Sequence, residues 1–224
     1  MASLDPPWGE IDTLLLDMDG TLLDLHFDNV FFRDLVPRVC GERWGMAPEL
    51  ARERVLGIYG EVAGTLAWYD LNHLSRALGL ELMPLKEELL HLMRMHPGVP
   101  EFLDRVRRSG RACHLVTNAH PLSLDLKLAR MPIREFFTSV VTSHDLGHPK
   151  ESLPFWPRLR EQLGFSPERT LLIDDSEPVL LAAHRFGLGH LLHIASPSSR
   201  DPVRPSWRFP TVAGVHSLLP ALPG

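Results

Sequence analysis

Four short apolar runs, each followed at once by polar or charged residues, constrain the fold of this chain more than any other feature. They cover residues 13–16, 112–116, 140–142 and 170–173, and a weaker fifth run covers residues 191–194. Continuous apolar runs of this length are typical of strands that are buried on both faces of a parallel sheet. Because helical apolar spacing separates the later runs, the sequence predicts an α/β fold in which helices flank a Rossmann-like parallel sheet.

The helices between the later strands are predicted together with their ends. Apolar residues at positions 99, 102, 103 and 106 form one stripe, with Pro100 near its start and Gly110 beyond its end. After the fourth run, Ser176 is typical of a helix cap, and Gly187 is expected to end the helix that follows. We also expect an irregular tail and then a short final helix, over residues 196–207 and 212–219.

Roughly seventy residues between Asp24 and His96 contain no convincing strand, although loops of that length without structure are uncommon. Apolar residues recur there at helical spacing. The sequence therefore predicts an α-helical insert over residues 25–95, and an α/β core built from residues 1–24 and 96–224.

Composition and charge exclude several classes of function. The chain of 224 residues has a formal net charge of −5 and no block of five basic residues, so no nucleic-acid partner is expected. No apolar stretch approaches the ~18 residues of a membrane span. Residues 1–10 lack the basic and apolar regions of a signal peptide. We therefore expect a cytoplasmic protein that does not bind membranes.

Two carboxylates follow the first strand, in the sequence Asp17-Met18-Asp19-Gly20-Thr21. Ligands of open α/β sheets bind beyond the carboxyl ends of the strands. Carboxylates this close repel each other unless a positive charge intervenes, and Mg²⁺ prefers such oxygen ligands. The alternative is a plain acidic surface turn.

The next two strand ends carry groups that suit a phosphate. Thr117 and Asn118 stand before a helical stretch, where a hydroxyl and backbone N–H groups form an anion cradle. Lys150 follows the third strand and could neutralise a transferring phosphoryl group. Taken alone, the first pair could be an ordinary strand-end cap, and Lys150 could be a solvated surface lysine.

The fourth strand ends in Asp174-Asp175-Ser176, directly before a helix. Adjacent acids at the end of an apolar strand are costly unless they bind a cation, although Asp175 could merely cap the helix. Four successive strand ends thus place groups that can bind a cation or a phosphate on one edge of one sheet. Such a combination would seldom arise by chance.

In this order, the segments DMDGT, TN, Lys150 and IDDS resemble the four motifs of the haloacid dehalogenase-like superfamily of phosphohydrolases. The resemblance implies that the insert, residues 25–95, is the helical cap domain of this superfamily. It also implies that Asp17 is the nucleophile and Asp19 the general acid and base. It also implies a set of binding roles. Phosphate would be held by Thr117, Asn118 and Lys150, and Mg²⁺ by Asp17, Asp19, Asp174 and Asp175.

Longer segments, among them TNAHP, GHPKE and RTLLIDDSE, are similar to bacterial nucleotidases of this superfamily that hydrolyse GMP and IMP. The resemblance implies a small phosphate monoester, a purine nucleotide, as the substrate. A phosphatase for a sugar phosphate or phosphoglycolate is the main alternative. A metal-free dehalogenase would lack Asp19, a receiver-like signalling domain is about half this length, and a binding module without catalysis would not need every reactive residue type.

Several residues of the insert and its surroundings are candidates for contact with the leaving group. Aromatic faces stack on any base, which makes Trp68 and Tyr69 candidates, and Phe27 and Asn29 stand in the first flap. His120 lies three residues after Thr117. The alternative is that Phe27, Trp68 and Tyr69 form the core of the insert and that His120 lies on the surface.

Overall fold

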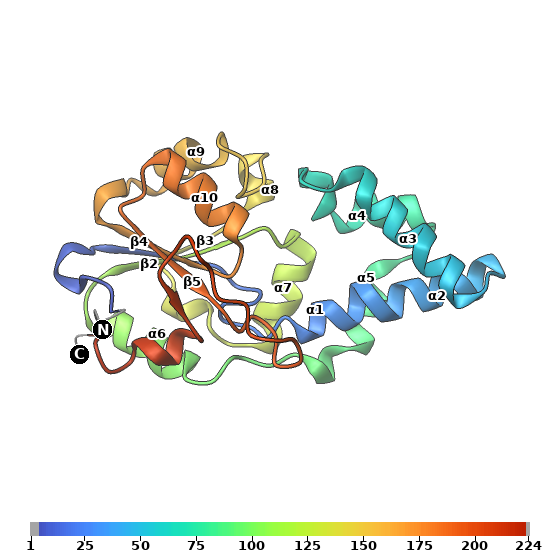
Figure 1. Ribbon diagram of the computed structural model, residues 1–224, viewed down its shortest axis with the longest axis horizontal. Helices are drawn as coiled ribbons and strands as arrows, with labels where there is room; N and C mark the ends of the chain where they lie inside the picture. Colours follow the sequence, from blue (N-terminus) through green and yellow to red (C-terminus); the bar gives the residue numbers. More distant parts are fainter. Residues whose placement is uncertain (1–4, 223–224) are drawn as a thin grey trace.

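A six-stranded parallel sheet forms the centre of this computed structural model, which describes residues 5–222 (Figure 1). The strands lie in the order β3-β2-β1-β4-β5-β6. Their bounds are β1 Thr13–Leu16, β2 Ala112–Thr117, β3 Ser139–Thr142, β4 Thr170–Asp174, β5 His190–Ile194 and β6 Thr211–Val212. Because every pair is parallel, all carboxyl ends meet at one edge of the sheet.

The register of the central strands decides which side chains leave the sheet together. Leu16 of β1 lies opposite Leu115 of β2 and Ile173 of β4. The next residue of β1 is Asp17 and the next residue of β4 is Asp174, so these two carboxylates emerge side by side.

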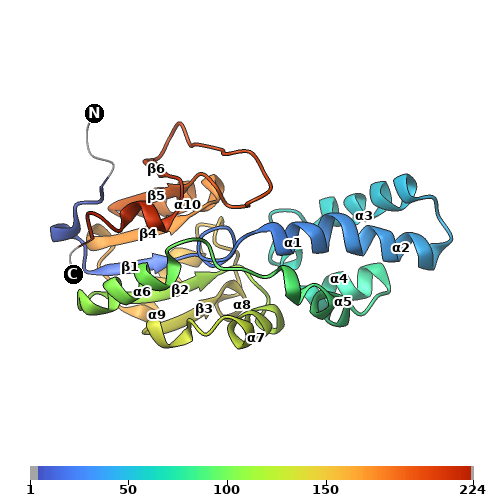
Figure 2. The ribbon, with the colours of Figure 1, turned by 90° about the horizontal axis from the view of Figure 1, so that it is seen from below.

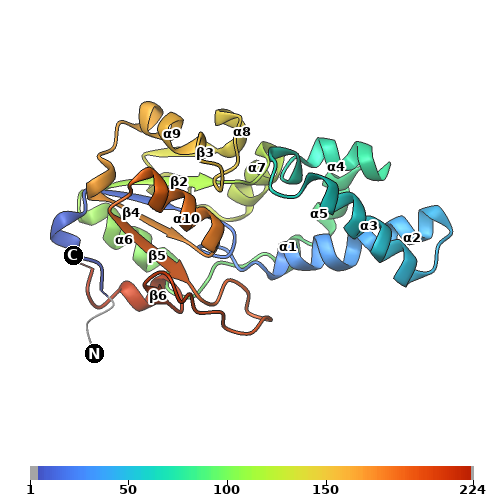
Figure 3. The ribbon, with the colours of Figure 1, turned by 45° about the horizontal axis from the view of Figure 1, so that its top comes forward.

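Helices cover both faces of the sheet, which explains why its strands are apolar without alternation (Figures 1 and 3). On β1, Leu14 and Leu16 belong to one apolar cluster and Leu15 belongs to the other. The first cluster includes side chains of α6 Val99–Arg108, α7 Pro121–Arg130 and the 3₁₀ helix Val215–Leu218. The second includes side chains of α8 Ser143–Leu146, α9 Phe155–Leu163 and α10 Glu177–Phe186.

The insert after β1 is helical and projects beyond the carboxyl end of the sheet (Figure 2). Its helices are α1 His26–Val30, which continues through a π-helical turn, Phe31–Leu35, into α2 Val36–Trp44, then α3 Pro48–Val62, α4 Leu71–Leu78 and α5 Leu82–Glu88. Their apolar side chains form a third cluster whose members all come from residues 31–89. The insert therefore has an apolar core of its own.

The predicted α/β fold with a helical insert is confirmed. The first predicted strand has the bounds of β1, and each of the other four is one residue shorter at one end than the strand in the structure. Two predictions were incomplete or wrong. The sequence reading did not locate α3, because Leu50 and Leu56 are exposed on it and blur its apolar stripe. The final helix predicted over 212–219 is a strand followed by a 3₁₀ helix, because the backbone of β6 pairs with the edge of β5.

Among residues 5–222, none of the helices combines the length and apolar character that a membrane span requires.

Candidate active site

A cavity of about 450 Å³ lies at the carboxyl end of the sheet, between the core and the inserted helices. The predicted residues of all four strand ends line it: Asp17, Asp19, Thr117, Asn118, Lys150, Asp174 and Asp175. The insert contributes Asn29, Trp68 and Tyr69, and His120 lines it from the start of α7. Of the residues predicted from the sequence, Phe27 does not line it.

Lys150 joins two of the carboxylates. Its Nζ donates to Asp17 Oδ1 at 2.5 Å and to Asp174 Oδ2 at 2.7 Å, and also to the carbonyl oxygen of Val116 at 3.1 Å. The side chain is only 2% exposed. The alternative of a solvated surface lysine is therefore wrong, because the ammonium group is buried and its three acceptors belong to the protein.

Hydrogen bonds fix the backbone of Lys150 on both sides. Its N–H donates to Asn118 Oδ1 at 2.9 Å, and its carbonyl oxygen accepts from Trp156 Nε1 at 2.9 Å. Trp156 is fully buried among the apolar side chains under the sheet. The position of the ammonium group is thus tied to the packing of the core.

The cluster carries more negative than positive charge. Burial raises the pKa of Asp17 to about 6; Lys150 opposes this shift and Asp174 adds to it. Burial also raises the pKa of Asp175, with the charges of Asp17 and Asp174 acting in the same direction. Burial disfavours the charged form of Lys150, but the carboxylates of Asp17 and Asp174 raise its pKa. One lysine thus faces three carboxylates.

This cluster fits a divalent cation such as Mg²⁺. Ligand oxygens of Asp17, Asp174 and Asp175 lie within 4.8 Å of one another, and a charge of +2 would balance the excess. Gly20 makes room for them: its φ is +90°, and a Cβ there would lie 2.7 Å from Cγ of Asp175. Carboxylate oxygens are the ligands that Mg²⁺ prefers.

Ser176 is the N-cap residue of α10 and Gly187 follows its last residue, as predicted, but the hydrogen bond at the helix start is not the expected one. Ser176 makes no side-chain hydrogen bond as a cap, and its N–H donates to Asp174 Oδ1 at 2.9 Å. Asp174 therefore supports the first turn, while Asp175 lies against Gly20. The alternative in which Asp175 merely caps the helix is not what the structure shows.

The end of β2 supplies polar groups from both backbone and side chain. Thr117 Oγ1 accepts from the N–H of Ala119 at 3.0 Å. The side chain of Asn118 is engaged at both ends, since its Nδ2 donates to Glu151 Oε2 at 2.9 Å. The side chain of Asn118 thus ties the β2 loop to the Lys150 loop.

Asp19 has a partner that the sequence did not reveal. Lys127 of α7 donates from Nζ to Asp19 Oδ1 at 2.6 Å and to Asp28 Oδ2 at 2.7 Å. Burial raises the pKa of Asp19 to about 6, against the opposing charge of Lys127. The only sequence signal is spacing, because Lys127 follows His120 by seven residues and so lies on the same face of the helix.

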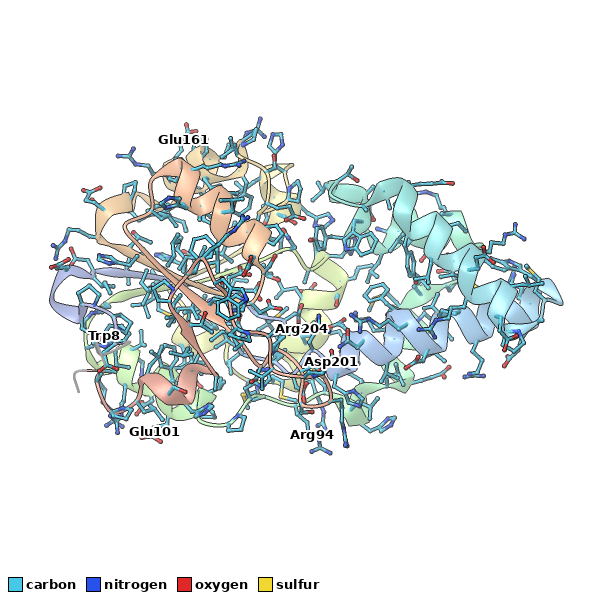
Figure 4. All side chains as sticks on the ribbon, in the orientation of Figure 1. Trp8, Arg94, Glu101, Glu161, Asp201 and Arg204 are labelled. Atoms are coloured by element: carbon cyan, nitrogen blue, oxygen red, sulfur yellow. The ribbon has the colours of Figure 1, made fainter. Side chains whose placement is uncertain are left out.

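The predicted contacts of the insert divide into two groups. Tyr69 and Asn29 reach other parts of the chain: Tyr69 Oη donates to Glu151 Oε1 at 2.8 Å, and Asn29 Nδ2 donates to Asp201 Oδ2 at 3.1 Å, on the loop beside α1 (Figure 4). Phe27 is instead 1% exposed, with the ammonium groups of Lys86 and Lys127 at 5.2 and 5.7 Å from its ring centre. Its ring is not available to a bound base in this structure.

An aromatic wall on the insert side was only partly anticipated. The ring of Tyr59 makes edge contacts with Phe32 at 6.0 Å and with Trp68 at 5.8 Å between centroids, and all three line the cavity. The buried Oη of Tyr59 and Oγ of Ser123 have no hydrogen-bond partner within the described part of the chain. Tyr59 follows buried Val55 by four residues on α3, which is the spacing that could have revealed it.

The chain is similar to known proteins over most of its length. Residues 11–187 match the family model of the haloacid dehalogenase-like hydrolases. The chain is 38% identical over 215 residues to YrfG, a GMP/IMP nucleotidase of Escherichia coli (strain K12), covering 96% of this chain and 97% of that protein. It is 26% identical over 136 residues to a phosphoglycolate phosphatase of Haemophilus influenzae, covering 59% and 61% of the two chains.

Solved structures show the same fold. A haloacid dehalogenase-like phosphatase from Thermococcus onnurineus superimposes with a TM-score of 0.77 at 20% identity, covering 95% of this chain and 99% of that chain. L-2-haloacid dehalogenase from Xanthobacter autotrophicus superimposes with a TM-score of 0.64 at 16% identity, covering 93% and 96%. The chain belongs to the haloacid dehalogenase-like hydrolases.

We expect Mg²⁺ to stabilise the protein, and more so at about pH 8 than at about pH 5.5. Because the pKa values of Asp17 and Asp175 are raised in the metal-free protein, their negative charges destabilise the fold at high pH. For Asp17 this destabilisation is lost as the pH falls through about 6 and the carboxylate takes up a proton. At 100 times its dissociation constant, Mg²⁺ should raise the melting temperature by about 5–10 °C at the higher pH.

Differential scanning fluorimetry with MgCl₂ and with EDTA measures this increment. Asp175→Asn is the matched control, because it removes one negative charge and one ligand while keeping the shape. Its melting temperature should rise without metal and respond little to Mg²⁺. An equal Mg²⁺ increment in both proteins would show that the cation binds elsewhere.

Proposed function

We propose that this chain is a Mg²⁺-dependent phosphomonoesterase that acts through a phosphorylated Asp17 and hydrolyses purine nucleoside 5′-monophosphates such as GMP and IMP. The observation that carries the chemistry is the buried ion pair between Lys150 and Asp17, beside two further carboxylates. The 38% identity to a GMP/IMP nucleotidase over nearly the whole chain supports the choice of substrate.

In the first step, a carboxylate oxygen of Asp17 attacks phosphorus, and the bond between phosphorus and the ester oxygen breaks. Asp19 gives its proton to the departing oxygen. In the second step, a water molecule attacks the phosphorus of the acyl phosphate and gives its proton to Asp19. Inorganic phosphate leaves, and both Asp17 and Asp19 return to their starting states.

The remaining groups bind and stabilise charge. Lys150 and the backbone N–H groups after Thr117 would face the phosphoryl oxygens. The groups that would hold Mg²⁺ are the carboxylates of Asp17, Asp174 and Asp175 and the main-chain carbonyl of Asp19. When bound, Mg²⁺ supplies positive charge beside the transferring phosphoryl group.

The insert, residues 25–95, would act as a cap that excludes water and binds the leaving nucleoside. A cavity of about 450 Å³ is of the size that small-molecule sites have. The aromatic wall of Phe32, Tyr59 and Trp68 offers ring faces and edges to a base, and the unpartnered hydroxyls of Tyr59 and Ser123 offer hydrogen bonds. Asn29, Tyr69 and His120 complete the candidate contacts.

The main competing substrate class is a small phosphate ester such as phosphoglycolate or a sugar phosphate. It is favoured by the more distant similarity to a phosphoglycolate phosphatase. The chemistry at Asp17 would be the same, so only the leaving-group side of the cavity distinguishes the two.

Replacing the nucleophile should abolish turnover. We expect Asp17→Asn to lower the rate of p-nitrophenyl phosphate hydrolysis in the presence of Mg²⁺ by about 10³-fold or more, because the neutral amide cannot attack phosphorus. Asp12→Asn is the control: its exposed carboxylate stands five residues earlier and pairs with Arg169, outside the cavity. An Asp17→Asn rate within tenfold of the wild type, itself sensitive to EDTA, would exclude the covalent route.

A panel of substrates tests the choice of leaving group. We expect kcat/KM for GMP and IMP to exceed that for CMP, UMP, phosphoglycolate and glucose 6-phosphate by about tenfold or more, since one extra contact in a buried site is worth a factor of this order. A preference for phosphoglycolate or a sugar phosphate would assign the enzyme to the competing class.

The hydroxyl of Tyr59 should contribute to that preference. We expect Tyr59→Phe to lower kcat/KM for IMP by about two- to tenfold, the equivalent of one neutral hydrogen bond of about 0.5–1.5 kcal/mol. The rate with p-nitrophenyl phosphate should stay the same, because that leaving group has no purine edge. Equal losses on both substrates would mean that Tyr59 only supports the packing of α3.

A further inference from the structure

Two buried lysines and two partly buried carboxylates form a chain of alternating charge that runs from the insert to Asp19, the predicted acid. Lys86 of α5 donates from Nζ to Asp28 Oδ1 at 2.5 Å, and Asp28 Oδ2 accepts from Lys127 of α7 at 2.7 Å. Lys127 in turn donates to Asp19 Oδ1 at 2.6 Å. The helix α7 lies between the sheet and the inserted helices, so this chain of contacts crosses from the insert to the core (Figures 1 and 3).

The two lysines are buried as deeply as apolar core residues. Each side chain is 2% exposed. Three phenylalanine rings surround Lys86, with their centres at 5.2 Å for Phe27, 4.7 Å for Phe31 and 5.1 Å for Phe32. Two lysines and two carboxylates leave no net charge, which makes such deep burial tolerable.

A gain in folding stability does not explain well why these charged side chains are buried. Buried ion pairs are often no more stabilising than apolar side chains of the same volume, because desolvation offsets the attraction. The pairs instead fix positions. Asp28 uses one oxygen for each lysine, so Lys127 is held on one side by Asp28 and presents its ammonium group to Asp19 on the other.

We propose that Lys127 is a positioning residue for Asp19, and that Asp28 and Lys86 hold Lys127 in place. Contact with Lys127 Nζ fixes Oδ1 of Asp19 and leaves Oδ2 for the proton transfer to the leaving oxygen. Lys127 keeps its own proton throughout. Lys86 and Asp28 belong to the insert. The position of the insert relative to the core therefore determines the orientation of the Asp19 carboxyl group. The inference rests on the proposed function, in which Asp19 protonates the leaving group.

Two substrates that differ in their leaving group test whether Lys127 positions Asp19. Phenyl phosphate and p-nitrophenyl phosphate are similar in size, but the phenolate is the poorer leaving group and depends more on a proton donor. The ratio of their kcat/KM values therefore reports how well Asp19 is placed. General acids contribute about 10²–10⁴-fold, so a displaced acid should cost a large part of that factor with phenyl phosphate.

The main variant is Asp28→Asn, which keeps the shape of the side chain but offers a single acceptor and so cannot hold both ammonium groups. We expect kcat/KM for phenyl phosphate to fall about tenfold or more, with p-nitrophenyl phosphate changed less than about threefold. Lys127→Met should show the same change in the ratio. Should Lys127→Met fail to fold, Asp28→Asn still decides the question.

Two control variants distinguish a failure of the positioning role of Lys127 from a failure of the proposed role of Asp19. Leu124→Ala removes a buried apolar side chain from the same helix, so it should lower the melting temperature without changing the ratio. Asp19→Asn should change the ratio at least as much as Asp28→Asn does. If Asp19→Asn changes the ratio while Asp28→Asn and Lys127→Met do not, the positioning role is overturned and the proposed function stands. If Asp19→Asn itself leaves the ratio unchanged, Asp19 is not the acid, and the positioning role falls with it.

Discussion

The contact of Lys150 with Asp17 and Asp174 is the interaction on which the rest of the site depends. Parallel strands in register bring these carboxylates side by side beyond β1 and β4, where they would repel each other. A buried ammonium group between them offsets part of that repulsion. With Asp175 added, three carboxylates face one lysine, and this excess of negative charge makes the cluster suitable for a divalent cation.

The sheet positions these groups, and the loops complete the site. Lys150 reaches the carboxylates because its backbone is tied to Asn118 and to the buried ring of Trp156. Glu151, the next residue, accepts from both Asn118 and Tyr69, so the same loop also contacts the insert. One short segment after β3 therefore joins the charge cluster, the predicted phosphate cradle and the side of the cavity that the insert forms.

The sheet could be predicted from the sequence because its strands are short, apolar and interrupted by helical spacing. The proximity of the residues at the strand ends followed from that prediction, because the carboxyl ends of parallel strands meet at one edge of the sheet. Long-range contacts of charged side chains could not be predicted in this way. Lys86 and Lys127 lie on helices, where a lysine ordinarily indicates a solvated face, and only the packing of α1, α5 and α7 together buries them. For Phe27 the sequence left open a substrate contact or a packed residue of the insert, and its ring is buried beside these two lysines.

Direct trapping of the phosphorylated residue tests the central claim, that Lys150 and its partner carboxylates present Asp17 as the nucleophile. The enzyme with Mg²⁺ and p-nitrophenyl phosphate would be acid-quenched during turnover and treated with borohydride, which reduces an aspartyl phosphate to homoserine. Peptide mapping by mass spectrometry then locates the change. We expect homoserine at position 17 in the wild type, and none there without substrate. Modification at another residue, or an unmodified Asp17 in an actively turning-over enzyme, would contradict it.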